Sequence, residues 1–156
     1  MIRLIAAIDT ERGLARDNQI PWKIPADITR FRRLTLTHGA KVLVGRNTYE
    51  QMGNYFSDHE TYIVSRQDLE LPKEHTLVKD IDTFLKELKG DIWVIGGAGI
   101  YAASIKYADE IYLTIVEGDH NCDQFFPEYS SFKAKDIEGP LEDNGYKFIY
   151  QLLTRF

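Results

Sequence analysis

The chain has 156 residues, of which 44% are hydrophobic and 28% charged, and its formal net charge is −5. This size and composition predict one globular domain over residues 1–156 with a substantial apolar core. The acidic balance argues against a general binder of nucleic acids or of membrane surfaces, because both functions need a dominant basic face.

Cysteine and histidine usage limits the chemistry further. Cys122 is the only cysteine, and the four histidines are scattered along the chain. We therefore expect neither an internal disulfide nor a metal site. The apolar residues at the start form too short a run for a signal peptide or a membrane span, so the expected location is the cytoplasm.

Short apolar runs alternate with helical patterns along the chain. In chain order they predict a strand at 3–9, a helix at 25–36, a strand at 41–45, a helix at 46–52, a strand at 60–66, a helix at 81–89, a strand at 91–97, a helix at 99–107, and strands at 110–118 and 146–156. Such alternation is typical of an α/β fold with a mainly parallel sheet, to which the long final strand can add an antiparallel edge. Ligands of these sheets bind beyond the carboxyl ends of the strands.

The helix that begins at Pro25 has a carboxylate on its apolar face. On a helical wheel Asp27 falls among Ile24, Ile28 and Phe31. An acid in a first turn complements the helix dipole, which is one explanation, but an exposed side chain would serve that purpose equally well. A buried carboxylate is costly unless it is paired, and burial raises its pKa. The alternative is therefore a group that moves protons in an active site.

Three predicted strands end in residues suited to phosphate. The strand at 41–45 is followed by Arg46, Asn47 and Thr48 after its last residue, Gly45. The strand at 60–66 ends in Ser65 and Arg66, and the strand at 91–97 ends in Gly96 and Gly97, with Gly99 just beyond. Taken singly, the arginines are explained as solvated charges and the glycines as tight turns, and the glycine spacing does not match the G-x-G-x-x-G fingerprint. Taken together, they favour one extended ligand with several phosphates.

Seven segments carry a resemblance that covers nearly the whole chain. In order they are LIAAID, N-x-x-PWKIPADITRF, VLVGRNTYEQMG, YIVSR, WVIGGAGIY, IYLT and DQFFP. Their order and spacing resemble the dihydrofolate reductase family. The resemblance implies a single α/β domain with a central eight-stranded, mostly parallel sheet, an antiparallel C-terminal edge strand and four flanking helices. It also implies a monomeric enzyme that reduces 7,8-dihydrofolate with NADPH, by hydride transfer to C6 and protonation of N5, and that binds antifolate inhibitors.

The resemblance assigns roles to residues of a substrate site. Asp27 is expected to hold the N3 and 2-amino edge of the pterin and to assist protonation of N5. Trp22 is expected to hold a water molecule, and Thr114 to share the hydrogen bonds around Asp27. The expected walls of the slot are Ile5, Ala6, Ala7, Ile28, Phe31, Met52 and Ile95. Loop 10–23 is expected to close over the nicotinamide as a lid.

The same resemblance implies a set of cofactor contacts. The residues expected around the phosphates are Arg46, Asn47, Thr48, Ser65 and Arg66, with Lys79 near the adenine. The other expected contacts are Ala7, Asn18, Ile20, Gly45, Gly96, Gly97, Ala98, Gly99, Ile100 and Tyr101. A cis peptide bond is expected between Gly96 and Gly97.

Two positions depart from the family pattern. His59 stands where the family usually has an arginine that clamps the glutamate tail of the substrate, and a histidine is a poor substitute for a guanidinium. Partial compensation is available from Arg30, Arg32 or Arg33 on the facing helix, of which Arg30 lies closest to the ligand face on the helical wheel. The alternative is that His59 faces solvent and no cation replaces the clamp. Cys122 replaces a frequent glycine in a loop that supports the lid.

Two other functions remain open at the level of sequence. A pyrimidine reductase of riboflavin synthesis shares the fold and the cofactor, but the segment PWKIPADITRF argues strongly against it. A nucleotide-binding module without catalysis would explain the phosphate sites, but it leaves Asp27 and Trp22 unexplained.

Overall fold

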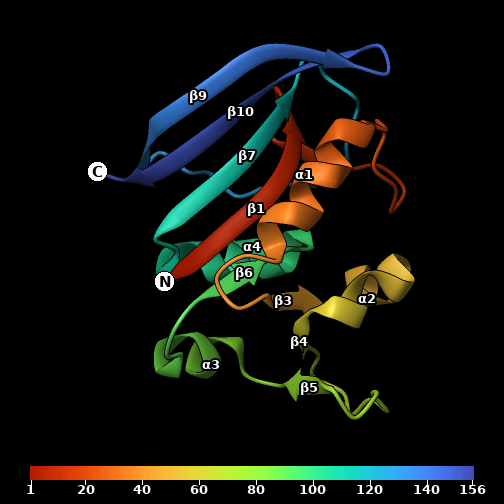
Figure 1. Cartoon of the computed structure of the whole chain (residues 1–156), viewed down its shortest axis with the longest axis vertical. Coiled ribbons are helices and arrows are strands. Elements are labelled where there is room, and N and C mark those ends of the chain that lie inside the picture. Colours follow the sequence, from red (N-terminus) through yellow and green to blue (C-terminus); the bar gives the residue numbers. More distant parts are fainter.

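The sheet is built from the apolar runs of the sequence, and the computed structural model describes all of residues 1–156. The strands are β1 (Ile2–Asp9), β2 (Gly13–Ala15), β3 (Lys41–Gly45), β4 (Glu60–Val64), β5 (His75–Val78), β6 (Ile92–Val94), β7 (Glu110–Val116), β8 (Gln124–Phe125), β9 (Phe132–Asp143) and β10 (Tyr146–Arg155). Eight of them form one sheet in the order β5-β4-β3-β6-β1-β7-β10-β9, and β2 pairs with β8 separately. The pairs from β5 to β7 are parallel, whereas β10 is antiparallel to both β7 and β9 (Figure 1).

Four helices flank this sheet, as expected. They are α1 (Pro25–Thr35), α2 (Arg46–Met52), α3 (Ile81–Glu87) and α4 (Ala98–Ser104), and two short 3-10 helices, η1 (Gly53–Asp58) and η2 (Ile105–Tyr107), follow α2 and α4. Pro25 occupies the start of α1, and Asp80 caps α3 by accepting a hydrogen bond from the Thr83 N–H at 3.2 Å. None of these helices has the length and hydropathy needed to cross a membrane.

Alternation along β1 divides the core into two layers. Leu4 and Ile8 pack in the layer that contains α3 and α4, whereas Ile5 packs in the layer that contains α1 and α2. In Figure 1, α1 lies in front of β1 and α4 behind it. A side chain that points from α1 to the sheet therefore lies in the core layer that contains Ile5.

The sequence patterns do not predict β5 or β9. β5 is a short edge strand, and nearly every residue of β9 is exposed, so β9 lacks the apolar alternation that marks a strand. The antiparallel C-terminal edge is therefore confirmed as a hairpin. Its outermost strand is β9, and the final strand β10 lies one place inside the edge.

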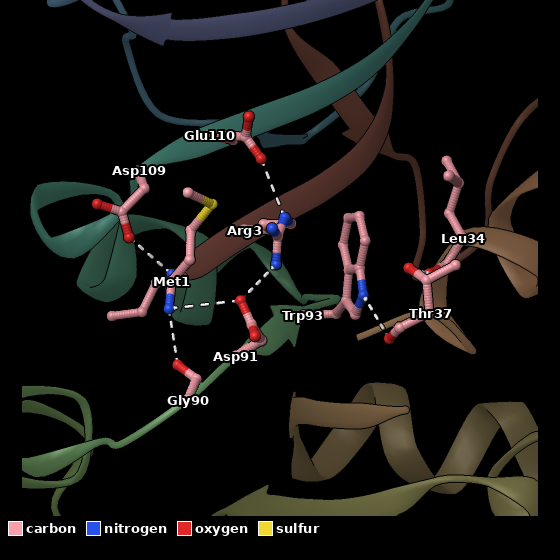
Figure 2. Close-up of polar contacts among 10 residues, drawn as sticks. Met1, Arg3, Leu34, Thr37, Gly90, Asp91, Trp93, Asp109 and Glu110 are labelled. Atoms are coloured by element: carbon pink, nitrogen blue, oxygen red, sulfur yellow. Dashed lines mark hydrogen bonds and ion pairs between the residues drawn. The ribbon is translucent and has the colours of Figure 1, made fainter. Parts of the chain in front are cut away.

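An ion-pair network joins the amino-terminal ends of β1, β6 and β7 (Figure 2). Arg3, only 7% exposed, donates hydrogen bonds to Asp91 at 2.8 Å and to Glu110 at 3.0 Å. Its guanidinium carbon lies 5.7 Å from the centre of the Trp93 ring. The network braces the end of the sheet opposite to the carboxyl ends, where parallel sheets bind their ligands.

Candidate active site

Asp27 points from the first turn of α1 to the sheet. The Thr114 hydroxyl on β7 donates a hydrogen bond of 2.6 Å to its Oδ1, and Thr114 itself is 3% exposed. Burial raises the pKa of Asp27, opposed by the Thr114 hydrogen bond and by the nearby charge of Arg30. The inward carboxylate expected from the helical wheel is thus present, and its direct partner is Thr114.

The expected walls of the substrate slot lie mostly on the α1 side of the sheet. Ile5 and Ile95 are buried there, with Phe31 and Met52 packed against the same cluster. Ile28 remains 57% exposed although it is apolar, as expected for a side chain beside an open site. Ala7 packs beside Trp22 in a third small cluster.

Ala6 departs from the expected wall. Its side chain belongs to the core layer of α3 and α4, on the other face of β1 from Ile5. The reason is the two-residue period of a strand, which sends neighbouring side chains to opposite faces. Only the backbone of Ala6 can border a site under α1.

The proposed lid, loop 10–23, is held from below by Asp9. The Asp9 carboxylate is 1% exposed and accepts hydrogen bonds from the backbone N–H groups of Glu11 at 2.9 Å, Gly13 at 2.7 Å and His120 at 2.9 Å. Burial opposes ionisation of Asp9, but these donors outweigh burial and hold its pKa below the ordinary value. Sequence reasoning missed Asp9, although an aspartate at the end of a strand before a turn is a usable signal.

The same loop contacts the segment 117–125 along its length. β2 of the loop pairs with β8, and the Gln124 amide donates to Asn18 Oδ1 at 2.9 Å. A Cβ added at Gly13 would meet the Cβ of Cys122 at 2.5 Å, so Cys122 packs directly under the loop. Ile20 is 63% exposed at the far part of the loop. Cys122, which departs from the family pattern, therefore packs against the loop that forms the proposed lid.

Trp22 is buried at the end of this loop. It is 6% exposed, clusters with Ile24 and Val116, and meets the His120 ring edge-on with 5.3 Å between ring centres. Its position between the loop and the carboxyl end of β7 agrees with a residue that shapes the site around Asp27.

The glycine-rich strand ends come together at the opposite side of the site. The Gly45 N–H donates to the Gly96 carbonyl at 2.8 Å, and the peptide bond between Gly96 and Gly97 is cis, as expected. A Cβ on Gly45 would lie 2.9 Å from Ile100, and one on Gly97 would lie 3.1 Å from the Thr48 hydroxyl. Gly45 therefore leaves room for Ile100 of α4, and a Cβ at Gly97 would press on Thr48 of α2.

Some of the polar side chains around these strand ends already have hydrogen-bond or ion-pair partners within the protein. Arg46 donates to Glu50 at 3.0 Å and to Gln67 at 2.9 Å, and Lys79 pairs with Asp68 at 2.5 Å. Arg66 and Asn47 are exposed, as are Gly99 and Lys79, while Ala98 is half-buried. Ser65 is buried and accepts from the Gln67 N–H at 3.1 Å. The adjacency of β4, β3 and β6 in the sheet brings the set to one edge.

Tyr101 is buried behind the glycine-rich end of β6. It is 5% exposed, and its hydroxyl donates to the Ile5 carbonyl at 2.6 Å. The hydroxyl is thus already used inside the protein, and Tyr101 supports Gly96 from behind, where the ring lies 3.2 Å from a Cβ built on that glycine.

His59 is neither a clamp nor a solvent-exposed residue. It is 6% exposed, stacks on Tyr55 with 4.8 Å between ring centres, and shares a hydrogen bond of 3.0 Å with the Thr35 hydroxyl. Burial lowers the pKa of His59, which disfavours the imidazolium form.

The three arginines of α1 divide between the two flanks of the helix. Arg32 pairs with Asp58, next to His59, whereas Arg30 lies over the Tyr150 ring on β10. Arg30 and Arg33 together line a cavity between α1 and the strands β7, β9 and β10. The prediction that Arg30 replaces the missing clamp is therefore not supported by its position, and Arg32 is the arginine on that flank.

Comparison with known proteins agrees with this geometry. The family model described as dihydrofolate reductase matches residues 1–155. Dihydrofolate reductase type 3 of Salmonella typhimurium is 32% identical, covering 99% of this chain and 98% of that protein. Dihydrofolate reductase of Bacillus subtilis (strain 168) is 31% identical, covering 98% and 92%.

A solved structure supports the fold. Dihydrofolate reductase from Enterococcus faecalis, complexed with NADP(H) and RAB-propyl, superimposes with a TM-score of 0.84 at 22% sequence identity, and the match covers 99% of this chain and 96% of that one. With the full-length family match and the relatives above 30% identity, it follows that this chain belongs to the dihydrofolate reductase family.

Proposed function

We propose that this protein reduces 7,8-dihydrofolate to 5,6,7,8-tetrahydrofolate with NADPH. One observation carries the proposal: a half-buried carboxylate, Asp27, is held by Thr114 at the carboxyl ends of β1 and β7, beside the glycine-rich end of β6. Membership of the family and the names of the full-length relatives support the same reaction.

Asp27 is the proposed recognition and proton-transfer group. A carboxylate can accept two parallel hydrogen bonds, which matches the N3–H and 2-amino edge of a pterin. Since Thr114 holds Oδ1, the carboxylate has one orientation before substrate arrives. Burial raises the pKa of Asp27, so this group releases and regains a proton more readily near neutral pH than an exposed aspartate.

The lid and Trp22 supply the dry surroundings that this chemistry needs. Trp22 is buried under the loop, and the apolar Ile20 is free to cover a ring bound beside Asp27. Excluding bulk water strengthens the hydrogen bonds to the carboxylate and leaves room for a single ordered water as proton carrier to N5. Ile28 and Phe31 would pack on the aromatic part of the substrate.

The glycine-rich strand ends, with Gly45, Gly96, Gly97 and Gly99, fit a dinucleotide cofactor. Gly45 and Gly97 admit no Cβ without moving a neighbour, and Gly99 is open to solvent with nothing within 4 Å of an added Cβ. The phosphates at the adjoining strand ends would be held by Arg46, Ser65 and Arg66. Further contacts on the phosphate and adenine side would come from Asn47, Thr48 and Lys79. The nicotinamide half would contact Ala7, Asn18, Ala98 and Ile100. When bound, NADPH supplies the hydride that reaches C6 of the pterin.

A single assay tests the proposal. Protein, NADPH and dihydrofolate are mixed, and loss of the nicotinamide absorbance is followed, with an aminopyrimidine ribosylamine phosphate as the competing substrate. Oxidation of NADPH only with dihydrofolate is the expected result. Oxidation only with the pyrimidine, or cofactor binding without turnover of either compound, would replace the proposal by a different function.

We further propose that the protein acts as a cytoplasmic monomer and that antifolates occupy the Asp27 site. The usual form of the family supports the first statement. The second follows because a diaminopyrimidine ring offers the same pair of donors to a carboxylate as the pterin edge does. Gel filtration and inhibitor titration in wild type and Asp27→Asn test the two statements.

A further inference from the structure

Asp27 has a neighbour on the next strand of the sheet. Thr114 on β7 lies opposite Tyr150 on β10 in the antiparallel register, so both side chains emerge on the face that α1 covers. Since Asp27 is bonded to Thr114, Tyr150 stands on the strand next to its partner. Tyr150 is 7% exposed, so its ring is a fixed surface.

Arg30 brings a cation to this surface. It follows Asp27 by three residues, on the same side of α1, and its guanidinium carbon lies 3.8 Å from the centre of the Tyr150 ring. None of the ion pairs within 4.0 Å in the structure includes Arg30. Its charge is therefore held near Asp27 by packing and is not neutralised by a carboxylate in contact.

Several charged and neutral groups surround Asp27 and Arg30. The titratable groups that face this region are Arg30 and Arg33 from α1, Tyr112 from β7, Tyr150 from β10, and Asp136, Glu138 and Asp143 from β9, while β7 and β1 also contribute the uncharged Thr114 and Ala7. Asp143 is engaged with the Ala26 N–H at 2.8 Å. Of the two arginines, Arg33 is exposed, whereas Arg30 packs on Tyr150, so Arg30 is the cation held on the side of Asp27.

We propose that Arg30 is a positioning residue that acts through Asp27: its guanidinium, held against Tyr150, favours the ionised carboxylate and so sets the pH at which Asp27 takes up a proton. The inference deepens the proposed function, on which only its kinetic consequence rests. The charge effect itself is a property of the protein without ligands, so it can be measured separately.

The direct test is a pH titration of the Asp27 carboxyl carbon by NMR in the ligand-free protein, with the resonance assigned by its absence in Asp27→Asn. Arg30→Met keeps an unbranched apolar stem on Tyr150 and removes the charge. We expect its Asp27 midpoint to rise by about 0.5–1 pH unit. Arg33→Met, which removes an exposed cation of the same helix and the same cavity, should leave the midpoint unchanged.

Two further variants separate charge from packing. In Arg30→Lys the Asp27 midpoint should stay close to that of wild type. In Arg30→Gln the midpoint should rise as much as in Arg30→Met, so the glutamine variant can replace the methionine variant if the latter folds poorly. A cavity of about 440 Å³ lies beside Arg30, and dissolved ions screen charges that face such water-filled space. Added potassium chloride should therefore raise the wild-type midpoint towards that of Arg30→Met while moving the variant less.

The kinetic consequence is a shifted pH profile. If Asp27 serves proton transfer, the alkaline limb of the hydride-transfer rate should move up with the midpoint, and Arg30→Met should be about three- to tenfold faster than wild type well above both midpoints. Equal NMR midpoints in wild type and Arg30→Met, or an equal rise in Arg33→Met, would overturn the inference. A raised midpoint in a protein without reductase activity would instead overturn the proposed function and leave the charge effect standing.

Discussion

At Asp27 the direction of one side chain separates two explanations of an acid in a first helical turn. An acid that only complements the helix dipole gains nothing from burial, because the dipole acts equally on the exposed face. The Asp27 carboxylate instead crosses to β7 and accepts the Thr114 hydroxyl at 2.6 Å. That position costs desolvation free energy, and a substrate edge with two donors would recover it.

Asp27→Asn should fold and bind NADPH normally but lose most turnover at neutral pH. The amide keeps the shape of the carboxylate but cannot pass a proton, so we expect kcat at pH 7 to fall by about 100- to 10,000-fold. The remaining rate should increase as the pH falls, because protons must then come from solvent. Stopped-flow hydride transfer between pH 5 and 9 measures this effect, and near wild-type rates throughout would reduce Asp27 to a helix cap.

Arg32 should bind the glutamate tail of the substrate, but its contribution to affinity should be small. His59 is buried against Thr35 and Tyr55, and Arg32 is already paired with Asp58. A tail carboxylate must compete with that exposed pair, so dihydrofolate should gain little over a dihydropterin without the tail. Asp58→Asn frees Arg32 and should improve KM for dihydrofolate by about two- to fivefold, with no change for the tail-less substrate.

The matched control for this prediction is Arg33→Ala, since Arg33 lies on the other flank of α1. Arg32→Ala should abolish the gain from Asp58→Asn, whereas Arg33→Ala should not. A large tail effect in wild type that survives Arg32→Ala would show that another group binds the tail.

At the scale of elements, the ends of β3 and β4 should determine cofactor choice. Arg66 is exposed and makes none of the ion pairs of the structure, whereas Arg46 already bonds Glu50 and Gln67. A charge-assisted contact to a 2′-phosphate is worth about 1.5–3 kcal/mol. Arg66→Ala should therefore lower kcat/KM for NADPH by about 10- to 150-fold and leave NADH nearly unchanged, with a smaller effect from Arg46→Ala.

Lys73→Ala is the control for charge alone, because it removes one exposed cation from the loop before β5. Its ratio of NADPH to NADH efficiency should equal that of wild type. Equal efficiency of the two cofactors in wild type would contradict the assignment of these strand ends.

The lid loop should loosen when Asp9 is changed. Oδ1 accepts from Glu11 and Gly13 and Oδ2 from His120, so an amide in either orientation places an NH2 group against a backbone N–H. We expect Asp9→Asn to lose about 2–4 kcal/mol of unfolding free energy. Amide exchange in residues 10–23 should accelerate and NADPH should bind more weakly.

The pH dependence of this loss has a definite sign. The pKa of Asp9 lies below its ordinary value in the folded protein, so its contribution is present above the unfolded pKa and disappears as the pH falls through the folded one. The stability gap between wild type and Asp9→Asn should therefore close in acid. Asp119→Asn, whose acceptor serves only the nearby Asn121 N–H, is the control and should change neither lid exchange nor cofactor affinity.

Elements with their own apolar pattern were predictable, and those that depend on partners were not. β1, β6 and β7 are buried runs, and α1 carries Asp27 on its apolar face, so local sequence suffices for both. β9 is exposed along nearly all its length and exists because β10 offers it a hydrogen-bonding edge. The flank on which Arg30 lies was similarly unpredictable, since it depends on Tyr150, which is remote in sequence.

Across the whole molecule, stability and chemistry are placed at opposite ends of the sheet. The Arg3 network ties together the amino ends of β1, β6 and β7 (Figure 2). Asp27, Thr114 and the glycine-rich loops instead occupy the carboxyl ends. Parallel strands make this division possible, because all their carboxyl ends lie at one edge. Substitutions at the amino ends should therefore change stability without changing the reaction.

Arg3→Met tests this separation. Removing a buried guanidinium leaves Glu110 without its partner, whereas Asp91 keeps the N-terminal ammonium group at 3.5 Å and, at 36% exposed, can recover water. The loss should therefore be about 2–3 kcal/mol, or about 5–10 °C in Tm. The Arg3 hydrogen bond lowers the pKa of Asp91, so this contribution is present above the unfolded pKa of Asp91 and fades as the pH falls through its folded pKa. Urea unfolding at several pH values should show the gap to wild type narrowing in acid, while kcat and KM at neutral pH stay within about twofold. A variant with unchanged stability and altered KM for NADPH or dihydrofolate would mean that the two ends of the sheet are coupled.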